Sequence, residues 1–241
     1  MRWTTTYATI GAAMSAGWLL ILGLLGAFVA GGFLYYWSRQ RALEARLQAL
    51  SSELDEKTTQ LGEATETLHR LAGIDNVTKL PNHSQFQDFL RNEWRRALRE
   101  ASSISVIIVD IDHFRDYNER LGHQAGDECL AKIADVLKVV VGRPGDLVSR
   151  FGGEEYGIVL SRTDQQGAYR VAHKVCAAVE ALNLEHPDSA SKRVTVSVGV
   201  ASATPAVDSS WEELELVAAA TRALIQAKQA GRNRVMAAAE P

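Results

Sequence analysis

The stretch that most constrains the fold is RFGGEEYGIVL, residues 150–160, in which two glycines and two adjacent acids separate two apolar runs. Glycine tolerates positive φ, so Gly152-Gly153 predicts a tight hairpin turn. The flanking runs DLVSRF and YGIVLS are short and rich in β-branched or aromatic residues, as is typical of strands. Glu154 and Glu155 then begin the returning strand with side chains on opposite faces. We therefore expect an antiparallel sheet whose hairpin carries two carboxylates.

A second pair of acids ends another strand-like run, SISVIIVDID. Asp110 and Asp112 lie on the same side of this run, and we expect them to converge with Glu154 and Glu155. Carboxylates of this kind suit Mg²⁺, which proteins hold by one or two acids together with substrate phosphates. Such an ion aligns and neutralises phosphates for in-line displacement. The alternative is that the acids only keep a hairpin tip solvated or cap strand and helix ends.

The chain from residue 74 to residue 241 alternates helical and strand patterns. Helical spacing is present in HSQFQDFLRNEWRRALREA and GDECLAKIADVLKVVVG, and near residues 166–182 and 211–228. The runs RVTVSVGVA and NRVM add two further strands. This mixed order around a central hairpin predicts an α/β domain, with a mostly antiparallel five-stranded sheet flanked by helices.

The N-terminal segment, residues 1–38, has a different character, since residues 3 to 38 include no charged residue. A membrane-spanning helix needs ~20 apolar residues. A cleavable signal peptide would have an apolar stretch of only ~7–15 residues, so this run is too long for one. Arg39, Arg41 and Arg46 follow closely, and the positive-inside rule places the C-terminal bulk in the cytoplasm. We expect a single-pass anchor in a lipid bilayer.

Residues 39–73 show a heptad pattern over about four repeats, as in coiled coils. Leucine fills most of the core positions, which are Leu43, Leu47, Leu50, Leu54, Lys57, Leu61, Ala64, Leu68 and Leu71. The lysine weakens the core but helps to fix the register. We expect a parallel homodimer, and the alternative is one amphipathic helix lying on its own domain.

Charge and cysteine usage exclude several classes of function. The net charge of −3 gives no general attraction to nucleic acid. Cys129 and Cys176 lie far apart and form no C-x-x-C motif or Cys/His cluster, so no zinc site is predicted. The six histidines show no H-E-x-x-H spacing.

Several segments of the chain resemble the GGDEF-domain diguanylate cyclases, which make cyclic di-GMP from two GTP. The loop GGEEY resembles the signature GG(D/E)EF, with Tyr156 in place of Phe. DNVTKLPNHSQF is similar to the family's opening D-x-L-T-x-L-x-N-R block, and VDIDHFRDYNERLGHQAGDECL to its D-x-D-x-F-K-x-x-N-D-x-x-G-H-x-x-G-D block. TVSVGVA and ALIQAKQAGRNRV resemble the closing T-x-S-x-G and A-K-x-x-G-R-N segments. The likeness runs from Asp75 to about Val235.

This resemblance implies a fold similar to the nucleotidyl cyclase and polymerase palm, at the bacterial inner membrane with the catalytic domain in the cytoplasm. It implies that Asp110 and Glu154 coordinate Mg²⁺, with Mn²⁺ as a second candidate, assisted by the carbonyl of Ile111. Glu155 would support the metal and the reacting 3′-hydroxyl. Asp110, Glu154 and Glu155 are thus the implied catalytic residues. Two subunits would face each other, each holding one GTP, and release two pyrophosphates.

The resemblance also implies the contacts to GTP. Asn118 and Asp127 would bind the guanine edge, and an acid suits guanine because its N1–H and N2–H₂ groups are both donors. The two loop glycines would leave room for phosphate, and the planar guanidinium of Arg232 would bind it with several donors. The positions implied to lie at the phosphates are Phe114, Arg115, Gly152, Gly153, Lys228 and Arg232.

An R-x-x-D motif, Arg143-Pro-Gly-Asp146, stands ahead of the loop at the spacing of the family's inhibitory site. Arginine binds guanine O6 and N7 with two hydrogen bonds and also clamps phosphate. The resemblance implies that the product cyclic di-GMP binds here and restrains catalysis. The alternative is a turn with a surface ion pair worth ~0–1 kcal/mol.

Departures from the family pattern are modest, and none removes an implied metal ligand. His83 replaces the usual arginine of the opening block, and Arg115 stands where lysine is common. Three other functions remain open. The chain could be a catalytically silent receptor for GTP or cyclic di-GMP, a cyclase acting on one nucleotide or making a mixed cyclic dinucleotide, or an anchored helical scaffold with a partner-binding module.

Overall fold

The computed structural model of this chain describes residues 31–41, 43–44, 46–60, 73–206 and 211–239. Its contacts divide the chain into two units, Met1–Thr65 and Glu66–Pro241. The predicted boundaries at residues 38 and 73 stay predictions. The predicted anchor, residues 1–38, falls mostly outside the described residues. Among the residues that are described, no helix is both long and apolar enough to cross a membrane.

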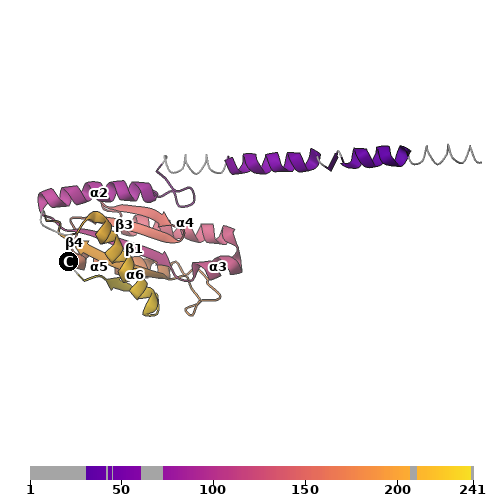
Figure 1. Ribbon diagram of the computed structural model, residues 1–241. Helices are drawn as coiled ribbons and strands as arrows, with labels where there is room; N and C mark the ends of the chain where they lie inside the picture. Colours follow the sequence, from indigo (N-terminus) through magenta and orange to yellow (C-terminus); the bar gives the residue numbers. More distant parts are fainter. Residues whose placement is uncertain (1–30, 42, 45, 61–72, 207–210, 240–241) are drawn as a thin grey trace, which may run out of the picture. The chain divides into compact units, whose positions relative to one another are not determined.

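The first unit is helical over its described part, residues 31–41, 43–44 and 46–60 (Figure 1). The predicted core leucines of this helix, at positions 43, 47, 50 and 54, are each 58% to 70% exposed in the single chain. A helix with a repeating apolar stripe gains stability by packing that stripe against another surface. The later core positions, from residue 61 to residue 71, lie outside the described residues, so the coiled coil stays a prediction.

The second unit is built on one five-stranded sheet in the order β2-β3-β1-β4-β5 (Figure 1). The central strand β1 pairs antiparallel with β3 and β4, β2 pairs antiparallel with β3, and β5 pairs parallel with β4. The predicted mostly antiparallel five-stranded sheet is therefore confirmed. The strands are β1 (Ile104–Ile111), β2 (Leu147–Gly152), β3 (Glu155–Ser161), β4 (Val196–Ala203) and β5 (Val235–Ala237).

Helices cover both faces of the sheet. The central strand β1 has apolar side chains on both faces, and each face is buried by packing against helices. Its residues Ile107 and Val109 belong to one core cluster with α4 and α5, whereas Val106 and Ile108 belong to another with α2 and α6. The helices are α2 (His83–Glu100), α3 (Phe114–Leu121), α4 (His123–Val140), α5 (Gln165–Ala181) and α6 (Glu213–Gln229).

Four of these five helices lie within three residues of the bounds that their apolar spacing predicts, and the largest difference is at the start of α4. The sequence analysis did not identify α3. This helix has only eight residues, of which Phe114 and Tyr117 alone are buried, so it presents almost no periodic apolar pattern. It begins directly after β1 and carries several of the residues implied to contact GTP.

The tyrosine of the GGEEY loop is accommodated by a hydrogen bond. Tyr156 is fully buried on β3, and its hydroxyl donates to the carbonyl oxygen of Leu130 in α4 at 2.8 Å. Burial raises the pKa of this phenol, so it remains a neutral donor. The replacement of Phe by Tyr thus keeps the ring in the core and adds a bond between sheet and helix.

We expect Tyr156→Phe to lower the free energy of unfolding by about 1 kcal/mol, because it removes one buried hydrogen bond and leaves the ring in place. Turnover of substrate should stay at the parent level, since the hydroxyl faces α4 and not the loop. Urea denaturation of the parent, the variant and the half-exposed control Tyr169→Phe measures this. An unchanged midpoint for Tyr156→Phe would contradict the expected contribution.

Candidate functional site

The two acidic segments predicted to meet do meet, at one end of the central strand. β1 ends with Asp110 and Ile111, and β3 begins with Glu155. The strand register places Asp110 directly opposite Glu155. Glu154 precedes Glu155 in the turn. Cross-strand partners have Cβ atoms about 4.5–5.5 Å apart, so these carboxyl groups share one small region.

The glycine turn leaves free space beside its backbone and is held in place by one side chain, that of Arg150. A Cβ added at Gly153 would meet no atom within 4 Å, and one at Gly152 would meet only a Glu155 oxygen at 3.8 Å. Arg150 on β2 donates from Nε and Nη2 to the carbonyl oxygen of Gly153, at 3.0 and 2.6 Å. Its Nη1 donates to both oxygens of Asp75 at 3.1 Å. The sequence analysis did not identify Arg150 as the residue that holds this turn.

Asp110 is buried and has a lysine beside it. The Nζ atom of Lys228, near the end of α6, lies 2.7 Å from its Oδ2. Burial raises the pKa of Asp110 to about 6; Lys228 opposes this rise, and the charges of Glu154 and Glu155 add to it. The two glutamates are therefore close enough to act on Asp110. Lys228, predicted to hold phosphate, is brought to the acids and is not a solvated last-turn lysine.

The raised pKa of Asp110 predicts a pH-dependent stability. Below about pH 6 the folded protein keeps this proton, whereas the unfolded chain releases it near the ordinary value of 3.8. Since the folded state binds more protons between these values, stability falls as the pH rises through this window. Thermal melting in EDTA should show this fall for the parent and a smaller one for Asp110→Asn. Equal pH dependence of both proteins would contradict the assignment.

These residues fit a divalent cation of the Mg²⁺ type. In the part of the chain that the structure describes, no three His, Cys, Asp or Glu side chains form a group that could hold a metal by themselves. Mg²⁺ commonly takes one or two carboxylates and completes its coordination with phosphate oxygens and water. Asp110, Glu154 and the carbonyl of Ile111 provide such a partial set. Lys228 already places a positive charge beside Asp110.

The prediction that Asp112 converges with these acids is wrong. Its Oδ1 accepts the hydroxyl of Ser197 at 2.6 Å. Its Oδ2 accepts the hydroxyl of Thr195 at 2.7 Å and the backbone N–H of Asn233 at 3.0 Å. Three protein donors thus occupy this buried carboxylate, although it lies on the same face of the sheet as Asp110, whose strand partner is Ser197.

A second group of residues lies where α3 packs against α4. The Oδ1 atom of Asn118 is buried and has no hydrogen-bond partner. Gly126 lies against it, because a Cβ there would overlap this oxygen and come within 3.3 Å of Phe114 Cζ. Phe114 stacks on Tyr117 with ring planes 8° apart. An unpaired buried acceptor is rare in proteins, which makes Asn118 Oδ1 a candidate binding atom.

Asp127 is exposed on α4, one residue after Gly126. The N-cap of α4 is Gly122, so Asp127 is not a helix cap. Arg115 is 88% exposed at the side chain and pairs with Glu119 on its own helix at 2.9 Å. Arg232 follows α6 with a left-handed φ of 62°. The structure therefore brings Lys228 to the acids and Asn118 against Gly126 of α4, whereas Arg115 lies in a local surface ion pair.

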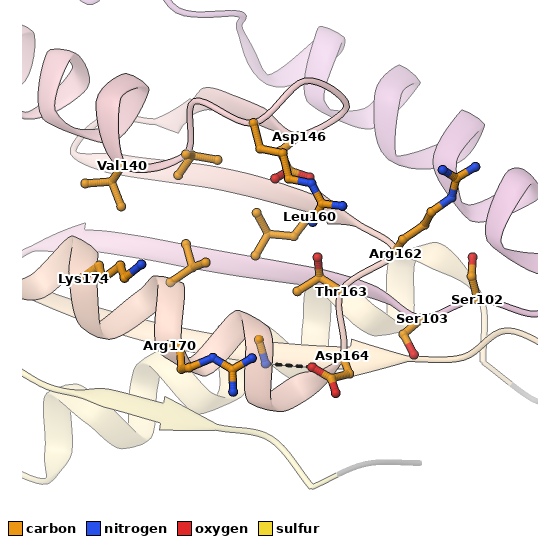
Figure 2. Close-up of a pocket in the computed structure, with 14 residues that line it drawn as sticks. Ser102, Ser103, Val140, Asp146, Leu160, Arg162, Thr163, Asp164, Arg170 and Lys174 are labelled. Carbon is orange, nitrogen blue, oxygen red and sulfur yellow. Dashed lines mark hydrogen bonds between the residues drawn. The ribbon is translucent and has the colours of Figure 1, made fainter.

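The R-x-x-D residues lie at a different place, in a pocket of about 610 Å³ (Figure 2). Arg143 and Asp146 line it from the loop after α4, and Asp146 accepts the backbone N–H of Ser161 at 3.0 Å. Burial raises the pKa of Asp146. Figure 2 shows Arg170 and Lys174 reaching the pocket from α5. Their spacing of four residues on one helix face is a signal that the sequence analysis did not use.

Residues 72–234 match the family described as "Diguanylate cyclase, GGDEF domain". Probable diguanylate cyclase DgcC of Escherichia coli (strain K12) is 33% identical over 181 residues, which are 75% of this chain and 47% of DgcC. Diguanylate cyclase DosC of the same strain is 34% identical over 163 residues, which are 68% of this chain and 34% of DosC. The chain spans less than half of the length of either relative.

Solved structures agree with the fold. The GGDEF domain of DgcB from Caulobacter crescentus, in complex with c-di-GMP, has a TM-score of 0.63 at 29% identity, with 69% of this chain and 93% of that chain covered. The active GGEEF domain of a diguanylate cyclase from Vibrio cholerae has a TM-score of 0.57 at 28% identity, with 67% and 99% covered. With its family match, sheet and acidic hairpin, this chain belongs to the GGDEF-domain family of diguanylate cyclases.

Proposed function

We propose that this chain is a diguanylate cyclase, which condenses two GTP into cyclic di-GMP and releases two pyrophosphates. The observation that carries the proposal is the register of β1 and β3, which sets Asp110 opposite Glu155 beside the glycine turn. Lys228 adds a cation at the same place. The arrangement combines carboxylates for a metal, an open backbone for phosphate and a positive side chain, which phosphoryl transfer uses for positioning and charge neutralisation.

The residues divide the chemistry among them. Asp110, Glu154 and the carbonyl of Ile111 would hold Mg²⁺, with Mn²⁺ as a second candidate, and this ion when bound would align and neutralise phosphates. Glu155 lies opposite Asp110 and is positioned to accept the proton of a 3′-hydroxyl. The attacking 3′-oxygen then displaces pyrophosphate from the α-phosphorus of the second GTP.

Guanine recognition is assigned to Asn118 on α3 and Asp127 on α4. The unpaired Oδ1 of Asn118 would accept a hydrogen bond from the exocyclic amine of guanine, which adenine lacks at this position. Asp127 is exposed one turn into α4 and offers a second acceptor. A site that pairs polar groups with a substrate rejects analogues that leave those groups unpaired.

The reaction needs two nucleotides and therefore two domains that face each other. We infer a homodimer through the predicted coiled coil of residues 39–73, supported by the exposed leucines of its described part. Holding two domains on short linkers raises their effective concentration to about the mM range. The coiled coil and GGDEF domain of DgcB from Caulobacter crescentus, in complex with c-di-GMP, has a TM-score of 0.63 and covers 81% of this chain.

Incubation of the purified full chain with GTP and MgCl₂ tests the function. Chromatography should show cyclic di-GMP, with one pyrophosphate released for each GTP consumed. Cyclic GMP, or cyclic AMP from ATP, would show a cyclase acting on one nucleotide, and a mixed product would appear only with both nucleotides present. Binding of GTP without release of pyrophosphate would identify a silent receptor.

We further propose that cyclic di-GMP binds in the pocket of Arg143 and Asp146 and inhibits the enzyme. The support is the pocket itself, whose lining combines Arg143, Arg170 and Lys174 with Asp146. Guanidinium groups pair with guanine edges and with phosphates, and cyclic di-GMP presents both.

Arg143→Ala is expected to raise the cyclic di-GMP concentration for half-inhibition about tenfold, because a bidentate arginine contact is worth ~1–3 kcal/mol. The initial rate without product should stay at the parent level. The control Arg99→Ala, at the end of α2, should leave both quantities unchanged. Inhibition of Arg143→Ala at the parent concentration would remove this pocket as the inhibitory site.

We also propose that residues 1–38 anchor the chain in the bacterial inner membrane as a single pass, with the catalytic domain in the cytoplasm. The support is the uncharged run of residues 3–38 and the arginines that follow it. Membrane fractionation of cells, with and without alkaline carbonate extraction, tests the anchor, since an integral span resists extraction.

A further inference from the structure

Asp112 joins two separate parts of the domain from a buried position. Its side chain takes the hydroxyls of Thr195 and Ser197, at the start of β4, and the backbone N–H of Asn233, after α6. All three donors are neutral. Two carboxylate oxygens can accept three hydrogen bonds together, whereas an amide has one oxygen and cannot accept from all three groups.

The segment that receives this bond is strained. Gly231, Arg232 and Asn233 have φ values of 114°, 62° and 44° in succession. Left-handed conformations cost roughly 1–2 kcal/mol for a residue with a side chain, and they persist only when surrounding contacts hold them. Two consecutive non-glycine residues in this conformation therefore need external support.

Side chains support one peptide group of this segment through both its N–H and its carbonyl oxygen. The peptide between Arg232 and Asn233 donates its N–H to Asp112 Oδ2 at 3.0 Å. Its carbonyl oxygen, that of Arg232, accepts Nε of Arg234 at 2.9 Å. Fixing this peptide plane fixes the ψ angle of Arg232. Two backbone hydrogen bonds hold the segment on either side of this peptide. The N–H of Arg232 donates to the carbonyl oxygen of Ala227 at 3.0 Å, and the N–H of Val198 donates to the carbonyl oxygen of Arg234 at 2.9 Å.

We propose that Asp112 is a positioning residue, which holds the backbone of Arg232 in the conformation that presents its guanidinium to the triphosphate of GTP. The inference rests on the proposed function, in which Arg232 binds phosphate. The hydrogen-bond partners of the Asp112 side chain are Thr195, Ser197 and Asn233. Asp112 acts through the peptide that follows Arg232.

Asp112→Asn tests the proposal in the full chain. Supporting groups around a functional site change affinity by 10–100-fold when removed, and we expect the KM for GTP to rise about tenfold with a smaller change in kcat. In an Arg232→Ala background the same change should alter KM by less than about twofold, because coupled residues are not additive. An equal KM rise in both backgrounds, or no rise in the parent, would overturn the proposal.

A matched control separates positioning from general stability. Ser105 lies on β1, the strand that ends directly before Asp112, and is fully buried. Its hydroxyl forms hydrogen bonds with the carbonyl oxygen of Thr163 at 2.7 Å and with Ser202 Oγ at 2.6 Å. Ser105→Ala should lower the melting temperature without raising KM. If Asp112→Asn does not fold, Thr195→Val replaces it, since Thr195 donates to the oxygen that holds Asn233. A KM rise of about threefold for Thr195→Val supports the proposal, and an unchanged KM overturns it.

Two further measurements keep this inference distinct from the proposed function. Titration with 3′-deoxy-GTP and Mg²⁺ gives a Kd for each variant without turnover, because this analogue lacks the attacking 3′-hydroxyl, and Asp112→Asn should weaken binding in parallel with the rise in KM. Hydrogen exchange should show faster exchange at the Asn233 amide in the variant. A parent that binds GTP but makes no cyclic di-GMP would refute the cyclase while leaving this test intact, and unchanged Kd in Asp112→Asn would refute the positioning role alone.

Discussion

Glu154→Gln is expected to lower the kcat for cyclic di-GMP synthesis by about a thousandfold, the size typical of removing one charged group that stabilises a transition state. The substitution keeps the shape of the side chain and removes its charge. Glu154 precedes the residue opposite Asp110, and its charge reaches Asp110 strongly enough to raise the pKa of that acid. Loss of this charge removes one of the two side chains proposed to hold the metal.

The measurement is the initial rate of cyclic di-GMP formation at saturating GTP over a range of MgCl₂ concentrations. Asp135→Asn makes the same change of charge at an exposed position of α4 and should keep the parent rate. Glu154→Gln should melt at or above the parent temperature, because it removes a negative charge beside buried Asp110. A rate above one tenth of the parent, or loss of the fold, would refute the assignment of Glu154 to the metal site.

How much of this site the sequence could predict depends on the kind of contact. Alternation along β1 and the two glycines at the end of β2 predict that the acids meet. Strand register fixes which side chains lie opposite each other and on which face of the sheet. The convergence of Asp110 with Glu155 follows from such local rules. The same rule also puts Asp112 on the face of Asp110, since Ser197, the strand partner of Asp110, donates to its carboxylate. It could not predict that Thr195 and Asn233 would also donate to this carboxylate.

The contacts that the sequence could not predict join residues far apart in the chain. Arg150 holds the carbonyl of Gly153 and also Asp75, and Lys228 reaches Asp110 from the end of α6. No periodic pattern encodes such pairs, since each depends on how one helix or loop packs against the sheet. The sequence analysis did not predict α3 for a related reason, because eight residues with two buried side chains do not show a helical period.

Gly126→Ala is expected to lower kcat/KM for GTP about a hundredfold, although the change suits a helix. Alanine is better than glycine by about 1 kcal/mol inside a helix, so α4 itself should not be weakened. The new methyl group, however, would overlap Oδ1 of Asn118 and lie 3.0 Å from its Cγ, with Phe114 Cζ at 3.3 Å on another side. Asn118 must turn away, and a displacement of about 1 Å at a binding group is enough for a hundredfold effect.

The specificity of the variant decides whether Asn118 is the cause. ITP lacks the exocyclic amine that guanine would donate to Asn118 Oδ1, so the parent protein should prefer GTP to ITP, and Gly126→Ala should lose that preference. In an Asn118→Ala background the oxygen is gone, and Gly126→Ala should then change kcat/KM by less than about twofold. Rates for GTP and ITP that fall equally would instead place the damage in α4 as a whole, and the unpaired acceptor would no longer account for the choice of base.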